Sequence, residues 1–175
     1  MSGHNKWSKI KHKKAASDSK KSKIYSKLVK LIQIESKTSN GDVSSPGLRS
    51  VIEKAKAENM PKETIDRAVK KGLANDTALM EHVVYEAYGP GGCAMIIEGI
   101  TDNKNRSAAE IKHILSKNGL TLAAPGSAIW AFKKTDGVWV AETTTQITNT
   151  EEEKLEKLIE EITDQDDVQE VYINI

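Results

Sequence analysis

The first half of the chain places its apolar residues at the three- and four-residue spacing of amphipathic helices. Such stripes run over 23–37, 48–58 and 61–72. Pro61 suits the first turn of the third segment, and a glycine closes it. The pattern therefore predicts three short helices that form a bundle over 23–72, with mostly lysines on its outer surface.

Beyond a linker predicted at 73–80, the spacing of the apolar residues changes and predicts a mixture of strands and helices. Gly89–Gly92 and Asp136-Gly137 are typical of hairpin turns, and Thr150–Glu153 matches a capping box. The predicted elements are strands at 82–88 and 93–100, a helix at 107–118, strands at 128–134 and 138–142, a helix from about 150 and a strand at 168–175. This β-β-α-β-β-α-β order contains the split arrangement of ferredoxin-like folds. We therefore expect an α+β protein, a three-helix basic domain followed by a ferredoxin-like domain over 81–175.

Charge is distributed unevenly between the two halves. Residues 1–75 carry 18 Lys and Arg against 7 Asp and Glu, a net charge of +11, whereas residues 76–175 carry 8 against 18, a net charge of −10. Such asymmetry indicates a polyanion as the partner of the first half. The alternative is that the basic half pairs with the acidic half of the same chain.

Several classes of protein are excluded by what the sequence lacks. Cys93 is the single cysteine, so an intrachain disulfide is impossible and a reducing compartment is indicated. No His or Lys close in sequence would lower the pKa of its thiol, which favours a buried strand residue over a reactive one. No apolar run approaches the ~18 residues of a membrane span. We therefore expect a cytoplasmic protein.

Catalytic and metal-binding motifs are also missing. There is no Walker loop, nucleophile elbow or paired-cysteine site. His4 and His12 lack partners at ligand spacing, and no helix follows the glycine-rich turn to receive a phosphate. Asp164, Asp166 and Asp167 are best interpreted as a solvated helix end. We expect no enzyme activity, no cofactor and no metal.

The strongest functional pattern is the lysine-rich segment 1–22, which cannot bury enough apolar surface to fold alone. We expect a flexible arm, or one laid on the bundle through Trp7 and Ile10. Lysines that neutralise phosphates make binding weaken with salt, and lysine rather than arginine favours contact with the nucleic-acid backbone. The residues expected to bind nucleic acid are Lys6, Trp7, Lys9, Lys11, His12, Lys13, Lys14, Lys20, Lys21, Lys23, Lys27 and Lys30. Trp7 either stacks on a base or fixes the arm to the bundle.

The acidic half offers two weaker candidates. Its strands carry four aromatic residues, Trp130, Phe132, Trp139 and Tyr172. RNA-recognition modules with ferredoxin-like sheets stack bases on such residues, but the net charge of −10 repels phosphate, so we expect core or interdomain contacts instead. A polar loop opens the first helix of this half and could contact phosphate or carboxylate, although helix capping explains it as well. Its residues are Asn103, Lys104, Asn105 and Arg106.

Short motifs spread from residue 3 to residue 174 resemble those of one known family. They are Gly3-His4, Lys6-Trp7 and Ile10-Lys11; Asn59–Lys62 with Ile65; Tyr88–Gly92; Thr101–Arg106; Ser116–Gly119; Gly126-Ser127; and Asp166–Gln169 with Val171, Tyr172 and Asn174. Together they resemble the YebC-type proteins, which are widespread in bacteria and related to a mitochondrial translational activator. Because the motifs begin at Gly3, the resemblance implies no presequence and a bacterial cytoplasm.

The resemblance also implies a domain organisation and two activities. The family has three domains, with the third inserted into the second; here 137–142 runs almost directly into 148–167, so we expect the inserted domain to be missing, with the junction near 143–146. The implied activities are DNA binding near promoters and action on the ribosome. Our first hypothesis is a ribosome-associated translation factor whose lysine arm contacts ribosomal RNA.

The alternative hypothesis is a transcriptional regulator that binds duplex DNA. Only Gln33, Arg49 and Arg67 are available on the predicted helices to recognise base edges, which is a sparse set for this role. An enzyme or a purely protein-binding adaptor is the third and least supported hypothesis.

Overall fold

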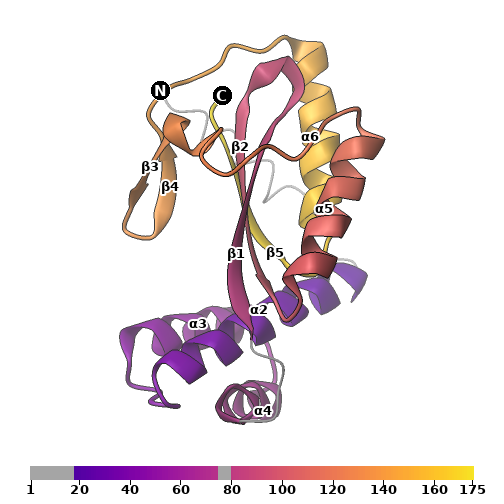
Figure 1. The fold of residues 1–175 in the computed structure, drawn as a ribbon. Helices are drawn as coiled ribbons and strands as arrows, with labels where there is room; N and C mark the ends of the chain where they lie inside the picture. Colours follow the sequence, from indigo (N-terminus) through magenta and orange to yellow (C-terminus); the bar gives the residue numbers. More distant parts are fainter. Residues whose placement is uncertain (1–17, 75–79) are drawn as a thin grey trace. The chain divides into compact units, whose positions relative to one another are not determined.

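The structure is a computed structural model that describes residues 18–74 and 80–175, with side chains from Lys21 onward. Most of the predicted arm therefore lies outside the described residues. The described chain divides into two compact units, a helical unit built on 18–74 and an α/β unit built on 83–99 and 104–175 (Figure 1).

The helical unit consists of three helices, α2 (Asp18–Thr38), α3 (Pro46–Ala57) and α4 (Lys62–Leu73), as the apolar spacing predicts. Its core contains Leu28, Ile32, Leu48, Val51, Ala55, Met60, Ile65 and Ala68. Helix α2 begins four residues before the predicted end of the arm at Ser22.

Helices α2 and α4 approach each other at a point where α4 has no side chain. A Cβ atom at Gly72 would lie 2.4 Å from the carbonyl oxygen of Gln33. Close by, the hydroxyl of Ser36 donates a hydrogen bond to the carbonyl oxygen of Val69, at 2.8 Å. Gly72 is therefore required for helix packing, a role that the sequence did not indicate.

The α/β unit contains the predicted order of strands and helices. Its elements are β1 (Glu81–Tyr88), η1 (Pro90–Gly92), β2 (Ala94–Thr101), α5 (Lys104–Lys117), η2 (Ile129–Ala131), β3 (Phe132–Thr135), β4 (Val138–Ala141), α6 (Asn149–Thr163) and β5 (Val168–Ile173). The capping box of α6 uses Thr148 and Glu151 rather than Thr150 and Glu153, the earlier of two overlapping matches. The α+β class and the element order are confirmed.

Strand pairing differs from a single ferredoxin-like sheet. Strands β1, β2 and β5 form one sheet with β2 in the middle, whereas β3 and β4 form a separate two-stranded sheet. Strand β2 pairs antiparallel with β5, with Glu98 opposite Glu170, and β3 pairs with β4, with Phe132 opposite Ala141. The short β3–β4 hairpin therefore does not extend the edge of the larger sheet.

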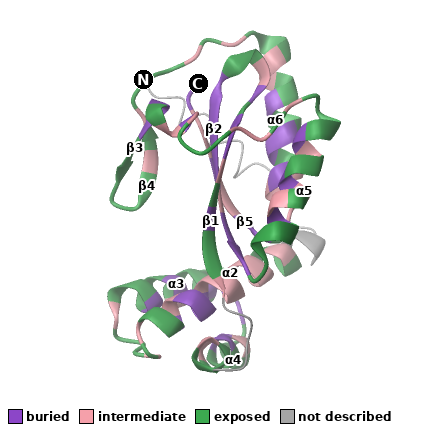
Figure 2. Cartoon of the chain, viewed as in Figure 1, coloured by how far each residue is buried: buried purple, intermediate pink, exposed green. Residues whose placement is uncertain are grey.

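The reason lies in strand β2, which is buried on both faces (Figure 2). Met95 and Ile97 belong to the core that α5 and α6 cover, whereas Ala94 and Ile96 belong to a second core that includes Phe132. Figure 1 shows the two helices on one side of the sheet and the hairpin on the other. The hairpin is needed to cover this second apolar face.

The hairpin is attached to the sheet through Glu98 of β2. This carboxylate accepts hydrogen bonds from Nζ of Lys134, at 2.9 Å, and from Nε1 of Trp139, at 2.8 Å. The turn at Asp136-Gly137 has φ angles of 51° and 81°, as the dipeptide predicts for a two-residue hairpin loop. No helix among residues 18–74 and 80–175 has the length and apolar character needed to cross a membrane.

Candidate nucleic-acid interface

The lysines of α2 form a stripe opposite its apolar face. At 100° per residue, Lys20, Lys23, Lys27 and Lys30 fall within about 80° of the helix circumference, and the centre of this arc lies about 160° from Ile32 of the core. The side chains of Lys23, Lys27 and Lys30 are partly exposed. We call these four lysines the α2 stripe. Its spacing presents a row of cations along one side of the helix.

The other predicted contacts lie elsewhere on the helix or outside the described residues. Lys21 is exposed but lies about 100° from Lys20 on the helix, so the structure separates it from the α2 stripe. The predicted arm contacts Lys6, Trp7, Lys9, Lys11, His12, Lys13 and Lys14 lie outside the described residues, as does the side chain of Lys20. Their role in binding stays a prediction.

The helical unit, with the α2 stripe included, is basic as a whole. Residues 18–74 contain 13 Lys and Arg against 7 Asp and Glu, a net charge of +6. Gln33, one of the three residues considered for base recognition, is only 6% exposed and packs against α4. Arg49 and Arg67 are exposed, but on different helices. The described helices thus present cations for phosphates more readily than a set of side chains for base edges.

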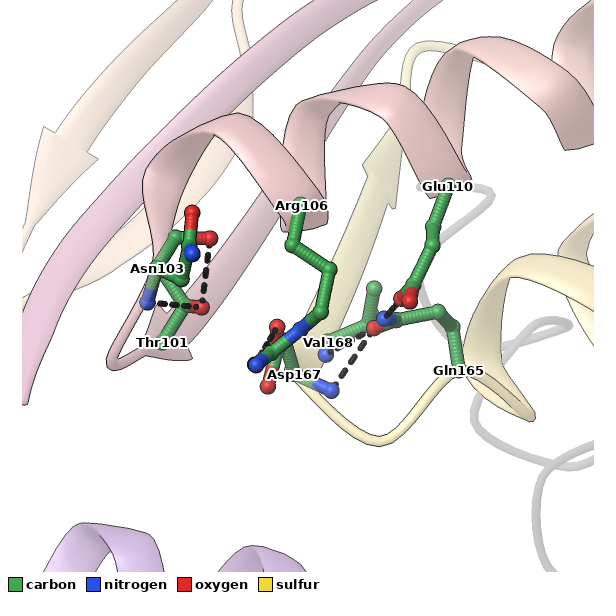
Figure 3. A network of polar contacts seen from close by, with 7 residues as sticks. All are labelled: Thr101, Asn103, Arg106, Glu110, Gln165, Asp167 and Val168. Atoms are coloured by element: carbon green, nitrogen blue, oxygen red, sulfur yellow. Dashed lines mark hydrogen bonds and ion pairs between the residues drawn. The ribbon is translucent and has the colours of Figure 1, made fainter.

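The predicted secondary contact lies at the start of α5 (Figure 3). The hydroxyl of Thr101 accepts a hydrogen bond from the backbone N–H of Asn103, at 3.0 Å, and donates one to its carbonyl oxygen, at 3.1 Å. Asn103, Lys104, Asn105 and Arg106 are all exposed. The bonds of Thr101 fix the turn that precedes the helix, and the role of these four residues in binding stays a prediction.

Arg106 is partly engaged by the fold. One of its guanidinium nitrogens lies 3.3 Å from a carboxylate oxygen of Asp167; the side chain of Arg106 is 47% exposed and that of Asp167 is 3% exposed. Because the buried carboxylate orients it, Arg106 has a structural role as well as exposed donors.

The acidic end of α6 is organised as a turn into β5. The Oε1 atom of Gln165 accepts hydrogen bonds from the backbone N–H groups of Asp167, at 2.7 Å, and Val168, at 3.1 Å, while Nε2 donates to Glu110 (Figure 3). In the part of the chain that the structure describes, no group of three or more His, Cys, Asp or Glu residues could hold a metal ion. These residues connect helix and strand.

A buried carboxylate that is not among the predicted site residues holds a loop on the face of the sheet opposite α5 and α6. Glu86 of β1 is 6% exposed and accepts hydrogen bonds from the backbone N–H groups of Gly126, Ala128 and Ile129, at 2.6, 2.7 and 2.8 Å. Burial alone would raise the pKa of Glu86, but the three donors together outweigh it, and the pKa lies below its ordinary value. The sequence contains one indication of this role, because Glu86 is the single acidic residue within the apolar run 83–88.

The aromatic residues of this unit do not form a stacking surface together. Phe132 is buried, and Trp139 and Tyr172 are half-buried against the second core. Trp130 differs, because it is 60% exposed. Cys93 is fully buried and lies just before β2 rather than within the predicted strand; burial raises the pKa of its thiol to about 11, as expected for an unreactive residue.

Comparison with family models identifies the whole described chain. Residues 5–75 match the TACO1/YebC protein N-terminal domain, and residues 80–138 and 133–175 match the TACO1/YebC second and third domain. The chain belongs to the TACO1/YebC family. The resemblance inferred from the motifs is therefore confirmed.

Family relatives match nearly all of this chain but are longer. A "probable transcriptional regulatory protein" from Desulfatibacillum aliphaticivorans is 47% identical over 173 residues, which cover 98% of this chain and 70% of the relative. A protein of the same name from Fervidobacterium nodosum is 48% identical over 143 residues, 81% of this chain and 57% of the relative. The chain thus spans between about half and three quarters of the length of such TACO1/YebC proteins.

A solved structure supports the fold. The crystal structure of a conserved hypothetical protein from Aquifex aeolicus is 28% identical and superposes with a TM-score of 0.86, covering 94% of each chain. The two segments that match the TACO1/YebC second and third domain meet at 133–138, in the β3–β4 hairpin. This break lies shortly before 143–146, where the sequence predicts the junction of a missing domain, and that absence stays a prediction.

Proposed function

We propose that this chain is a non-enzymatic, nucleic-acid-binding regulator of gene expression that acts as a ribosome-associated translation factor. The observation that carries the proposal is the α2 stripe, a row of lysines on one side of a helix in a unit with a net charge of +6. The printed name of the longer relatives, "probable transcriptional regulatory protein", supports a role in gene expression.

Contact with phosphates follows from the residue types. Lysine is a compact point charge without the planar fork by which arginine recognises a guanine edge. Four contacts from the α2 stripe should give a slope of log affinity against log salt of about −3 to −4. Contacts from the predicted arm would make this slope steeper.

A structured RNA is the better-supported target. With Gln33 buried, the described helices offer few side chains for base recognition in the major groove. Ribosomal RNA presents a dense, shaped phosphate surface on which a lysine-rich segment can order without reading sequence. The names of the relatives favour the alternative, a transcriptional regulator that binds duplex DNA.

The test is co-sedimentation of the purified chain with ribosomes at low and physiological salt, with duplex DNA as competitor. A variant carrying Lys23→Gln, Lys27→Gln and Lys30→Gln should bind less tightly, with a salt slope reduced by about 2 to 3. A control variant with the same change of charge replaces three exposed lysines of α5 and α6, Lys112, Lys154 and Lys157. It should bind like the wild type, and circular dichroism should show that both variants remain folded.

The arm is tested separately. Replacing Lys11, Lys13 and Lys14 by Glu should abolish binding without unfolding the helical unit. Wild-type affinity in the folded arm variant would show that the arm does not contribute to binding. Wild-type affinity and salt slope in the α2 variant would show the same for the α2 stripe. If excess DNA removes the protein from ribosomes equally at every salt concentration, the DNA-binding alternative takes precedence.

A further inference from the structure

An exposed aromatic pair lies on the sheet face opposite α5 and α6. Tyr85 and Ala87 of β1 belong to the core on the side of the helices, so Glu86 and Tyr88 face the other way. Tyr88 is 37% exposed and Trp130 is 60% exposed. The fold leaves a large indole surface in water, although burial would be favourable.

The pair is held in place by hydrogen bonds within the unit. Nε1 of Trp130 donates to the hydroxyl of Tyr88 at 3.2 Å, and that hydroxyl donates to the carbonyl oxygen of Ser127. The loop that carries Ser127 and leads into Trp130 is in turn fixed by Glu86, through its three backbone N–H donors. The polar donors of both aromatic side chains are therefore occupied, and the ring surface of Trp130 is what they leave for a ligand.

The segment that builds this surface is uncharged. Residues 118–132 contain no Asp, Glu, Lys or Arg, although 29% of the whole chain is charged. Glu86, the charged residue in 83–97, is buried. A neutral aromatic surface matches a neutral planar ligand better than a phosphate or a charged peptide.

The acidic charge of this half of the chain is concentrated elsewhere. Residues 149–167, which form α6 and the turn after it, contain nine Asp and Glu. Helix α6 packs through Leu155, Leu158, Ile159 and Ile162 on the opposite face of the sheet from Trp130. The net charge of −10, which argued against RNA stacking from sequence, is thus not centred on the face that carries Trp130.

We infer that Trp130, braced by Tyr88, is a stacking platform for an unpaired nucleobase. The inference rests on the proposed function and specifies a contact with single-stranded rather than helical nucleic acid. A base in a duplex has both faces covered by its neighbours, whereas an unpaired base can stack on an indole with little regard to sequence. In this proposal the lysines of the arm and the α2 stripe bind the phosphates of the nucleic acid, and Trp130 selects segments with unpaired bases.

The experiment measures binding of the full chain to two probes, an oligoadenylate of about 12 nucleotides and an RNA duplex of equal length. Trp130→Ala should weaken binding of the oligoadenylate by about 5- to 150-fold and leave duplex binding unchanged. The salt slope should not change, because no phosphate contact is lost. Trp130→Phe, which keeps a ring face, should recover part of the affinity.

The matched control is Val140→Ala, which shortens another exposed apolar side chain, 49% exposed on β4. It should bind both probes like the wild type. Equal affinity of wild type and Trp130→Ala for the oligoadenylate, or an equal loss for both probes, overturns the inference and leaves the proposed function intact. Failure of the wild type to bind either probe overturns both. A concentration-dependent dimer that Trp130→Ala abolishes would assign the surface to a second copy of the chain instead.

Discussion

Replacement of Glu86 by Gln tests how far one buried carboxylate holds the loop over the sheet. The carboxylate uses one oxygen for Gly126 and the other for Ala128 and Ile129. In Glu86→Gln the amide oxygen can keep two of these bonds, but the amide nitrogen then faces the third N–H, and two donors cannot bond each other. The fold of the variant should otherwise be retained.

The size of the effect follows from the bonds affected. Losing one hydrogen bond to a charged acceptor costs about 1.5–3 kcal/mol, and weakening two others to neutral bonds costs about 1 kcal/mol or less each. The reduced desolvation of a neutral amide offsets part of this sum. We expect the free energy of unfolding of the α/β unit to fall by about 2–4 kcal/mol.

Urea unfolding monitored by tryptophan fluorescence measures this change, because Trp130 and Trp139 both lie in the affected unit. With a slope of about 2 kcal/mol per molar urea, the midpoint should fall by roughly 1–2 M. Glu156→Gln, at an exposed position on α6, is the control and should leave the midpoint unchanged. An unchanged midpoint and slope in Glu86→Gln would refute the reasoning.

The same variant has a pH signature. Because the pKa of Glu86 lies below its ordinary 4.5 in the folded chain, the carboxylate contributes stability above about pH 4.5 and loses it as the pH falls through the folded pKa. The wild type should therefore lose stability in this acid range by an amount that Glu86→Gln does not show. Parallel curves of stability against pH for the two proteins would contradict the assignment.

Two further predictions concern other positions. Gly72→Ala should destabilise the helical unit by about 1–3 kcal/mol, because the new Cβ would lie 2.4 Å from the backbone oxygen of Gln33 and the helices must separate; a thermal melt followed by circular dichroism measures this, and an unchanged melting temperature would argue against the close approach. Cys93, whose pKa is raised to about 11 by burial, should resist a thiol reagent at pH 8 in the folded protein and react at once in urea; rapid labelling of the folded protein would contradict its burial.

The sequence predicted the helices and strands because their periodicity is local. The apolar spacing over 23–72 and the Asp136-Gly137 turn each report on a few neighbouring residues, and both predictions agree with the structure. Strand β2 shows what local periodicity cannot predict. Its unbroken apolar run, 94–97, indicates burial on two faces, but the run does not say which segment covers the second face, and the strands therefore pair as two sheets.

The candidate site was predictable in composition but not in arrangement. Counting lysines found the α2 stripe, whereas the net charge of −10 hid the fact that the acidic residues gather on and beside α6. Glu86 was missed because its three donors lie 40 to 43 residues further along the chain. Contacts of that separation leave no periodic trace in the sequence.

The pairing of β2 with β5 has a consequence for the order in which this protein acquires its structure during synthesis. Glu98 pairs with Glu170, so the central strand is translated long before its partner exists. The helical unit, whose hydrophobic core lies within 18–74, can form while later codons are still being read. The α/β unit must wait with an apolar strand uncovered until residue 173 has emerged, which makes this interval the stage at which a nascent chain would most need protection from aggregation.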